Sequence, residues 1–219
     1  MSGRQDSPHR FVFVRHAEAA CNVMTADAVI ERYDPHAPLT CRGRIQAETL
    51  AREMPEALVG DPVFSSPLRR ALDTATPLAR RHARSVRCDA RLEEMSATRV
   101  FSPPLSLAAW DDLLDRRVAE PAAEVAPGIE PLAVQDERVR AFLRDRHERR
   151  DGDPLTLVVA HAFSIELAII ALLGLSTAVL TSFRLRLSNA AIHVVENDQL
   201  GRPSRLLLVN AQNHFGRWL

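Results

Sequence analysis

The chain has 219 residues, 46% of them hydrophobic and 26% charged, which favours one globular domain, alone or with an insertion. Its formal net charge of +0 at pH 7 provides no field that would attract nucleic acid or an acidic membrane surface, and no apolar stretch approaches the roughly 20 residues of a membrane span. The 3 cysteines are odd in number and widely spaced, which excludes a disulfide framework and favours a reducing compartment, so we expect a cytoplasmic protein.

The first elements alternate between an apolar run and a helical pattern. Polar residues 1–9 predict a flexible N-terminal tail, and residues 11–14 (FVFV) are typical of a strand covered on both faces. Residues 38–54 predict a helix whose start Thr40 can cap. The stripe of this helix expected to face inward consists of Ile45, Thr49, Leu50 and Met54.

A second unit of strand, helix and strand follows. Residues 62–66 predict a strand, residues 67–83 a helix that opens with Pro67, and residues 86–92 a third strand. The pattern then breaks from residue 95 to about residue 131, where five prolines flank a short helical piece over residues 107–118. We interpret residues 95–131 as an insertion that covers the body of the domain like a lid.

The second half contains the clearest helix and strand patterns. Residues 131–150 predict an amphipathic helix with Leu132, Val139, Phe142 and Leu143 facing inward. The elements expected after it are a buried strand over 154–161, a helix over 162–175 ended by Gly174, and two strands over 182–198 and 204–210 separated by a turn at Gly201.

Strands that alternate with helices predict an α/β fold. We expect a three-layer α/β/α sandwich, in which helices cover both faces of a mostly parallel central sheet. Residues 10–219 would then form a single domain that carries the lid-like insertion.

Reactive side chains stand at the carboxyl end of each early strand. In an open parallel sheet these ends share one edge, and ligands bind beyond it. The residues found there are Arg15-His16, Ser65-Ser66 followed by Arg69-Arg70, Glu93-Glu94, and His161. The sequence therefore predicts that two histidines, two or more arginines and a glutamate meet at one site.

This combination of side chains suits the transfer of a phosphoryl group. Guanidinium groups bind phosphate oxygens through paired hydrogen bonds. A neutral imidazole can attack phosphorus to form a phosphohistidine, and neighbouring arginines favour the neutral ring. A carboxylic acid can protonate the leaving oxygen and then activate water, while a second histidine, when protonated, adds positive charge. These cations take the place of a metal, so we expect neither a metal nor a cofactor.

Six segments, in chain order, resemble the motifs of the histidine phosphatase superfamily, also called the phosphoglycerate-mutase-like family. They are RHAEAACN from Arg15, LTCRGRIQA from Leu39, SSPLRRALDTA from Ser65, VVAHAFSI from Val158, SNAAI from Ser188 and VNAQNHF from Val209. Each match alone is weak, but all of them in order form a strong signal. The last one resembles the ending common in the phosphatase branch.

The resemblance implies a role for each matching residue. His16 would be the nucleophile that becomes phosphorylated, and Glu94, in an L-x-E segment, the proton donor. Arg70 rather than Arg69 is the matching arginine, because it directly precedes the alanine of its motif. The groups implied to bind phosphate are Arg15, Asn22, Arg70, His161 and the backbone N–H of Ala162.

The chain departs from the family pattern in a few places. Ala17 and Ala162 stand where the family has glycines, which removes easy access to positive φ. The glycine and the WEG sequence that usually follow the acid are replaced by MSATRVFSPP, so Glu93 remains an alternative to Glu94. The role of Glu18 is open between orienting Arg15 and lying in solvent.

The resemblance implies a metal-independent phosphatase that hydrolyses a small phosphorylated metabolite and releases inorganic phosphate. Two alternatives stay open: a phosphoglycerate-type mutase, and a catalytically inactive phosphate-binding regulatory module. The C-terminal motif argues against the first, and the complete set of reactive residues argues against the second. We expect no nucleic-acid or membrane partner, and the sequence identifies neither the substrate nor the oligomeric state.

Overall fold

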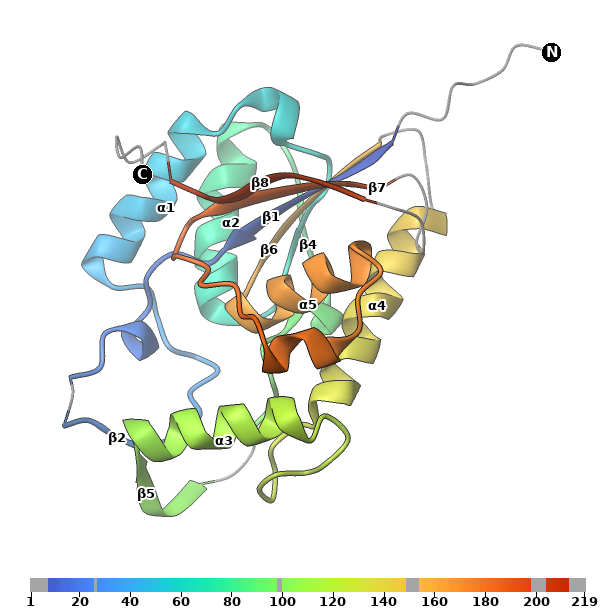
Figure 1. Ribbon diagram of the computed structural model, residues 1–219. Helices are drawn as coiled ribbons and strands as arrows, with labels where there is room; N and C mark the ends of the chain where they lie inside the picture. The colour runs from blue at the N-terminus through green and yellow to red at the C-terminus, as the bar shows by residue number, and fades with distance from the viewer. Residues whose placement is uncertain (1–7, 26, 98–99, 149–153, 198–203, 213–219) are drawn as a thin grey trace.

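Six strands form the central sheet of the computed structural model, which describes residues 8–25, 27–97, 100–148, 154–197 and 204–212 (Figure 1). The order across the sheet is β4-β3-β6-β1-β7-β8. β4, β3, β6 and β1 run parallel, whereas β7 and β8 are antiparallel to their neighbours. The strands are β1 (His9–Arg15), β3 (Val63–Ser65), β4 (Val86–Cys88), β6 (Leu155–Ala160), β7 (Ile192–Asn197) and β8 (Arg205–Ala211). The predicted, mostly parallel sheet is confirmed.

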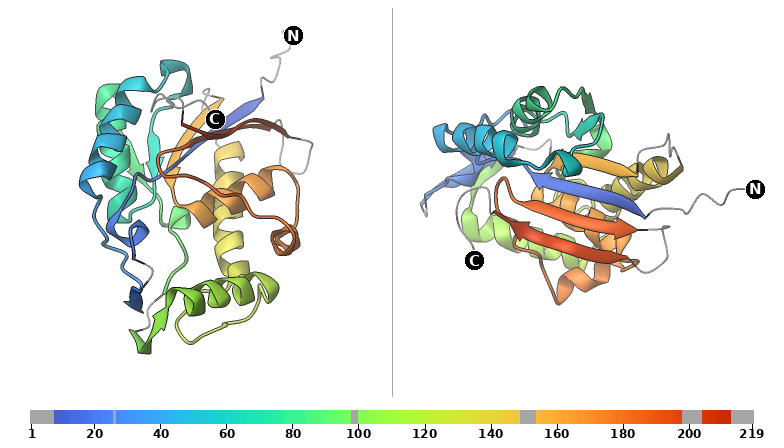
Figure 2. Two further views of the ribbon diagram at one scale, coloured as in Figure 1. Left: turned by 60° about the vertical axis from the view of Figure 1, so that its left-hand side comes forward. Right: turned by 90° about the horizontal axis from the view of Figure 1, so that it is seen from above.

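The residues of β1 explain why helices cover both faces of the sheet. Phe11 and Phe13 pack into one core with helices α4 (Leu132–Glu148) and α5 (Ala162–Leu172). Val12 and Val14 point the other way. They pack with α1 (Cys41–Glu53) and α2 (Arg69–Arg81) in a second core. The views in Figure 2 show these two helix layers on either side of the sheet. The predicted three-layer sandwich is confirmed.

The register between β1 and β6 aligns the ends of the two strands. Arg15 pairs with Ala160, so His16 and His161 leave adjacent strands at the same level. Ser65 of β3 pairs with Val159 of β6 in the same part of the sheet. The strand ends that carry the reactive residues therefore meet at one edge, as the parallel topology requires.

A second, smaller unit lies beyond that edge (Figure 1). Strands β2 (Val29–Arg32) and β5 (Val100–Ser106) pair antiparallel, and α3 (Leu107–Ala119) follows them. The sequence predicted α3 but neither strand. β2 finds its partner about seventy residues away, and β5 contains two prolines, which strands tolerate only at edges. Apolar residues hold the unit together: Ile30, Met95, Phe101, Leu113 and Ile129.

Short 3-10 helices complete the described elements, and one of them corrects the third predicted strand. β4 ends at Cys88, where the prediction continued to residue 92. The side chain of Asp89 accepts a hydrogen bond from the N–H of Arg91, which starts a 3-10 turn instead. The 3-10 helices are η1 (Ala20–Asn22), η2 (Glu56–Leu58), η3 (Ala90–Leu92) and η4 (Thr177–Thr181).

The stripe expected on α1 is wrong at one residue, Ile45. Thr40 does cap this helix, accepting from the N–H of Gly43 at 2.9 Å. Ile45, however, is 68% exposed. The buried face of α1 consists of Gly43, Ala47, Leu50 and Ala51. Small residues are buried here because the helix lies against the backbone of Glu18, which a side chain at position 43 would strike.

The strand expected over residues 182–198 is wrong in its first half. Alternating apolar residues such as Phe183 and Leu185 imitate a strand, but β7 begins only at Ile192. β1 ends at Arg15 and offers no further partner. The backbone N–H of Leu185 instead donates to the buried carboxylate of Glu166. This segment is therefore a loop held by side chains.

The ends of other predicted elements shift slightly. β1 begins at His9, because this side chain is buried and hydrogen-bonds Thr156 at 2.8 Å, so the predicted tail is one residue too long. α5 ends at Leu172, and Gly174 follows with φ of +70°, as a terminating glycine requires. Residues 1–7 of the tail, the turn at Gly201 and the last residues of the helix over 131–150 lie outside the described residues.

Candidate active site

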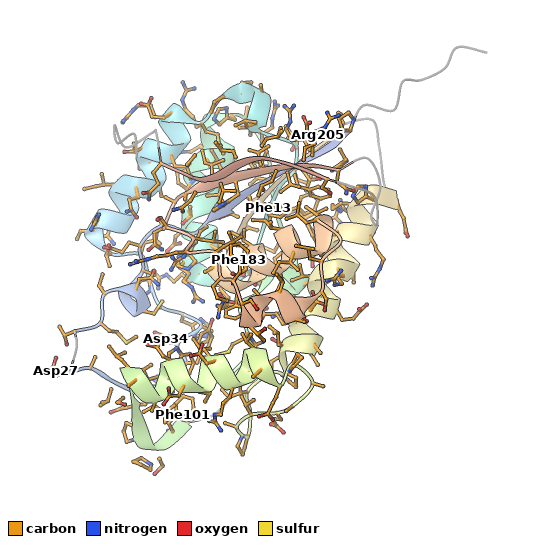
Figure 3. All side chains as sticks on the ribbon, in the orientation of Figure 1. Phe13, Asp27, Asp34, Phe101, Phe183 and Arg205 are labelled. Atoms are coloured by element: carbon orange, nitrogen blue, oxygen red, sulfur yellow. The ribbon has the colours of Figure 1, made fainter. Side chains whose placement is uncertain are left out.

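A cleft of about 670 Å³ is lined both by residues at the carboxyl edge of the sheet and by residues of the smaller unit. Its lining includes residues from the smaller unit, such as Trp110 and Leu114 of α3. In Figure 3, Asp34, which also lines the cleft, lies between α3 and the body of the sheet. Six of the predicted site residues line this cleft: Arg15, His16, Asn22, Arg70, Glu94 and Ala162.

His16 directly follows β1 and is only 3% exposed. Its Nδ1 lies 2.8 Å from the backbone oxygen of Ala17. Because a carbonyl oxygen only accepts, Nδ1 must carry the hydrogen, and in the neutral ring the lone pair stands on Nε2. Burial lowers the pKa of His16 well below its usual value, and the charges of Arg15 and Arg70 lower it further. The ring is therefore neutral near pH 7, with Nε2 free to act as a nucleophile.

His161 follows β6 and is fully buried beside His16, with ring centroids 5.1 Å apart. Its Nε2 lies 2.8 Å from the hydroxyl of Ser66, and its Nδ1 has no hydrogen-bond partner within the described residues. Burial lowers the pKa of His161 well below its usual value, and His16, Arg70 and Arg15 add to this effect. The positive charge of the site is therefore carried by its arginines.

Arg70, the second residue of α2, is 2% exposed. Its Nη2 donates to the hydroxyl of Tyr33 at 2.6 Å and its Nη1 to the backbone oxygen of Asp34 at 3.4 Å. Its Nε is buried and has no partner in the described part of the chain. Arg69, by contrast, is exposed and lies 3.4 Å from Asp73. The motif, which selects the arginine directly before Ala71, thus correctly distinguishes Arg70 in the cleft from Arg69 on the surface.

Arg15 at the end of β1 is the second guanidinium of the cleft. Its Nη1 donates to the backbone oxygen of Leu187, whereas its Nε is buried without a partner among the described residues. Burial lowers the pKa of Arg15, and the nearby Glu94 opposes that shift. Two buried Nε–H donors without partners line one cleft, and buried donors of this kind normally have an acceptor. An anion with several oxygens fits this requirement.

Asn22 lines the cleft but is also part of a local network. Its Oδ1 accepts from the N–H of Ala19 at 3.0 Å and from Nδ2 of Asn189 at 3.1 Å. Asn189 also donates to the backbone oxygen of His16 at 3.0 Å. Both asparagines therefore hold the loop after β1, and contact between Asn22 and phosphate stays a prediction.

Glu18 does not orient Arg15. Its Oε1 accepts from the hydroxyl of Thr40 at 2.7 Å, and its Oε2 lies 3.5 Å from Arg42. These contacts connect the loop after β1 to the start of α1.

Of the two candidate acids, Glu94 lines the cleft together with His16. Its Oε1 accepts from Gln135 Nε2 at 3.0 Å and from the N–H of Met95 at 3.2 Å, and its Oε2 accepts from the N–H of Phe163 at 3.1 Å. Glu93 contributes its backbone oxygen to Ser164 at 2.6 Å and to Arg138 at 2.7 Å. The geometry favours Glu94.

The alanines that replace family glycines fit their positions without strain. The non-glycine residues with positive φ in the described chain are Ala83, Ala190 and Asn210, so Ala17 and Ala162 need no conformation that only glycine adopts easily. Ala162 is the first residue of α5, where backbone N–H groups have no partner inside the helix. Its N–H is thus available to an anion in the cleft.

Several site residues received no role in the sequence analysis. Ser66 and Asn189 lie within recognised motifs, so their motif membership was a usable signal. Tyr33 and Gln135 reach the site from outside any motif, and no signal in the sequence points to them. Trp110 both lines the cleft and packs edge-on against Phe101, with ring centroids 5.9 Å apart.

No helix within the described ranges is long and apolar enough to cross a membrane. Residues 11–210 match a model of the histidine phosphatase superfamily (branch 1). The 5''-phosphoribostamycin phosphatase of Niallia circulans is 36% identical over 209 residues, which cover 94% of this chain and 98% of that protein.

Solved structures of similar fold cover almost the whole chain. A mycobacterial glucosyl-3-phosphoglycerate phosphatase in complex with VO3 has a TM-score of 0.73 at 27% identity, covering 93% of this chain and 100% of its own. A mycobacterial hydrolase has a TM-score of 0.75 at 25% identity, covering 94% of this chain and 99% of its own.

Proposed function

The chain belongs to the histidine phosphatase superfamily and is a phosphoric monoester hydrolase, and we propose that it acts through a phosphohistidine on His16 with Glu94 as proton donor. One observation carries this proposal. His16 Nδ1 donates to the backbone oxygen of Ala17, which leaves a neutral, buried Nε2 as the nucleophile in a cleft that two arginines share.

In the first step, the Nε2 lone pair of His16 attacks phosphorus and the bond from phosphorus to the ester oxygen breaks. The departing oxygen takes its bonding electron pair and receives a proton from Glu94, so the alcohol leaves neutral. The phosphoryl group is then bound to Nε2, and Glu94 is a carboxylate.

In the second step, the Glu94 carboxylate takes a proton from a water molecule while the water oxygen attacks phosphorus. The bond between phosphorus and nitrogen breaks, its electron pair returns to Nε2, and inorganic phosphate leaves. His16 and Glu94 are thereby restored to their starting protonation states.

The arginines supply the charge stabilisation in both steps. The phosphoryl oxygens gain negative charge in the transition state, and preformed donors near them lower the barrier. We assign this role to Arg15 and Arg70, whose buried Nε–H groups have no partner among the described residues. His161 Nδ1 and the Ala162 N–H are the further donors that we assign to the phosphoryl group.

The substrate is larger than phosphate, because the cleft extends along an apolar wall beyond the arginines. Met24, Met95, Trp110 and Phe163 contribute to that wall, and the guanidinium carbon of Arg184 lies 4.3 Å from the ring centre of Phe163. Small phosphomonoesters with a bulky or ring-containing alcohol fit this shape. Because a 36% identical protein acts on 5''-phosphoribostamycin, that compound belongs in the first substrate panel.

Replacement of His16 tests the mechanism directly. We expect the His16→Ala variant to lose phosphatase activity on p-nitrophenyl phosphate and on every member of a phosphomonoester panel that the wild type hydrolyses. Rapid quenching of the wild type with radiolabelled substrate should trap phosphate on the protein, stable to base and labile to acid. Undiminished turnover by His16→Ala would rule the mechanism out.

A further inference from the structure

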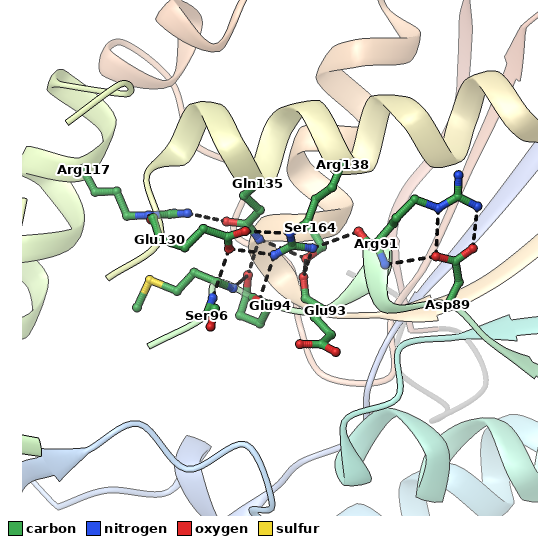
Figure 4. Close-up of polar contacts among 11 residues, drawn as sticks. Asp89, Arg91, Glu93, Glu94, Ser96, Arg117, Glu130, Gln135, Arg138 and Ser164 are labelled. Carbon is green, nitrogen blue, oxygen red and sulfur yellow. Dashed lines mark hydrogen bonds and ion pairs between the residues drawn. The ribbon is translucent and has the colours of Figure 1, made fainter. Parts of the chain in front are cut away.

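We infer that Gln135 and Arg117 position the Glu94 carboxyl so that Oε2, and not Oε1, carries the proton delivered to the leaving group. This inference rests on the proposed role of Glu94. It assigns two positioning residues that lie behind the acid, one on α4 and one on α3. Figure 4 shows Arg117, Gln135 and Glu94 joined in series.

Arg117 is a buried cation at the end of this series. It is fully buried, although Arg116 beside it on α3 is exposed. Its Nε donates to the backbone oxygen of Glu130 at 2.7 Å, and its Nη2 donates to Oε1 of Gln135 at 2.7 Å. Burial lowers the pKa of Arg117 to about 10, so it remains charged at neutral pH.

The contact with Arg117 fixes which way the Gln135 amide faces. A guanidinium only donates, so the amide oxygen must face Arg117 and the NH2 group must face the opposite side. There Nε2 reaches Glu94 Oε1 at 3.0 Å and the Ser164 hydroxyl oxygen at 3.1 Å. Gln135 is fully buried, so rotation of its amide would leave several polar groups unpaired.

Ser164 supports the same direction. Its hydroxyl donates to the backbone oxygen of Glu93 at 2.6 Å, because that oxygen can only accept. The Ser164 oxygen therefore accepts from Gln135, and one N–H of the amide is used there. The other N–H is left for Glu94. In the series Arg117, Gln135 and Glu94, each hydrogen bond therefore has a single possible direction: Arg117 donates to Gln135, and Gln135 donates to Glu94.

The two oxygens of Glu94 consequently differ. Oε1 receives two N–H donors, from Gln135 and from the backbone of Met95, whereas Oε2 receives one, from Phe163 at the start of α5. Oε1 has its lone pairs occupied, so a proton on the carboxyl belongs on Oε2. None of these three donors can accept that proton, which leaves the ester oxygen of the substrate as its destination.

Leaving-group dependence distinguishes this role from a purely structural one. A poor leaving group such as phenol needs the proton, whereas 2,4-dinitrophenol departs without it. We would measure kcat/KM for the aryl series from 2,4-dinitrophenyl to phenyl phosphate, because this parameter includes departure of the alcohol. The variants are Glu94→Gln, Gln135→Met and Gln135→Glu. The last one keeps the acceptor for Arg117 but would share the Glu94 proton between two carboxyls.

We expect Glu94→Gln to lose about 100-fold or more on phenyl phosphate and less than about 5-fold on 2,4-dinitrophenyl phosphate. Both Gln135 variants should likewise lose more on phenyl phosphate than on 2,4-dinitrophenyl phosphate, with losses of kcat/KM about a tenth as large as those of Glu94→Gln. Arg117→Met should resemble them, Arg117→Lys should recover most of the loss, and Arg116→Met is the matched surface control that we expect to equal wild type.

The possible results separate the inference from the proposed function. A uniform loss along the series in the Gln135 variants, no loss on phenyl phosphate, or failure of both variants to fold would make Gln135 a structural residue and overturn the inference. If Glu94→Gln itself shows no dependence on the leaving group, the proposed acid is wrong.

Discussion

The hydroxyl of Tyr33 lies 2.6 Å from Nη2 of Arg70, and the guanidinium carbon of Arg70 lies 5.7 Å from the centre of the same ring. Burial raises the pKa of Tyr33, so the neutral hydroxyl accepts from Arg70 over the whole physiological range. Tyr33, which directly follows β2, thus holds the Arg70 side chain of α2 in place.

Removal of that hydroxyl should loosen Arg70 without removing its charge. A hydrogen bond to a charged group contributes about 1.5–3 kcal/mol, and without it the binding of phosphate must also fix the loosened Arg70 side chain. We expect Tyr33→Phe to raise the inhibition constant of inorganic phosphate by about fivefold, or about 1 kcal/mol. Inhibition assays with phosphate measure this directly. An unchanged constant would show that Arg70 needs no support from Tyr33.

The adjacent arginines at the start of α2 should behave in opposite ways. Arg70 lines the cleft, whereas Arg69 is exposed near Asp73. Loss of a donor that stabilises transition-state charge costs about 10²–10³-fold, and loss of its full charge costs more. We expect Arg70→Ala to lower kcat/KM by about 10³-fold and Arg69→Ala to leave it within about twofold. Equal losses in both variants would contradict the site as described.

The adjacent glutamates provide a similar pair. Glu94 presents its carboxylate to the cleft, while the main contacts of Glu93 use its backbone oxygen, which a side-chain change preserves. Kinetics on phenyl phosphate should therefore show a large loss for Glu94→Gln and a change of less than about threefold for Glu93→Gln. The reverse result would move the acid to Glu93.

Residues adjacent to strand ends are the part of the site that the sequence could predict. Arg15 ends a strand with an unmistakable apolar run, and His16 and His161 directly follow such strands, so parallel topology brings these residues together. The position of Arg70 in its motif added the distinction from Arg69. Local pattern and topology were sufficient for these residues.

Long-range packing decides the parts that the sequence did not reveal. β2 exists because a partner strand about seventy residues away pairs with it, and Ile45 is exposed because α1 packs through small residues. Gln135 occupies an ordinary polar position of an amphipathic helix, and only the fold shows Glu94 on one side of its amide and Arg117 on the other. Contacts of this kind produce no periodic pattern in the sequence, so the sequence cannot predict them.

Buried neutral histidines should make the protein sensitive to acid. His193 is fully buried, its Nδ1 accepts from the N–H of Asn210 at 3.1 Å, and burial, followed by the charge of Arg15, lowers its pKa to about 4. In the unfolded chain a histidine takes up its proton near pH 6.5, so between about pH 6.5 and 4 only the unfolded state gains it. The contribution of His193 to the free energy of unfolding is therefore fully present above about pH 6.5. It decreases as the pH falls toward about 4, by up to about 3 kcal/mol.

Urea unfolding at pH 7.5 and pH 5, in phosphate-free buffer, measures this loss. The lowered pKa values of His16 and His161 act in the same direction. The free energy of unfolding of the wild type should therefore fall by more than His193 alone accounts for. His193→Gln keeps an acceptor for Asn210 but does not titrate, and we expect it to reduce the loss. His36→Gln, at an exposed position, should leave the loss unchanged. Equal pH dependence in the wild type and His193→Gln would contradict the assignment.

Gly43 should tolerate no side chain, because α1 touches the loop that carries His16. A Cβ at this position would lie 1.9 Å from the backbone oxygen of Glu18, well inside van der Waals contact. Gly43→Ala must therefore separate the helix from residues 17–18, at a cost of about 3 kcal/mol or more. We expect a melting temperature lower by about 6–12 °C and a fall in kcat/KM, since the displaced backbone includes the Ala17 oxygen that fixes the His16 ring. Glu48→Ala, at an exposed position of the same helix, should change neither quantity, and a Gly43→Ala variant with wild-type melting and turnover would show that α1 can shift without disturbing the nucleophile.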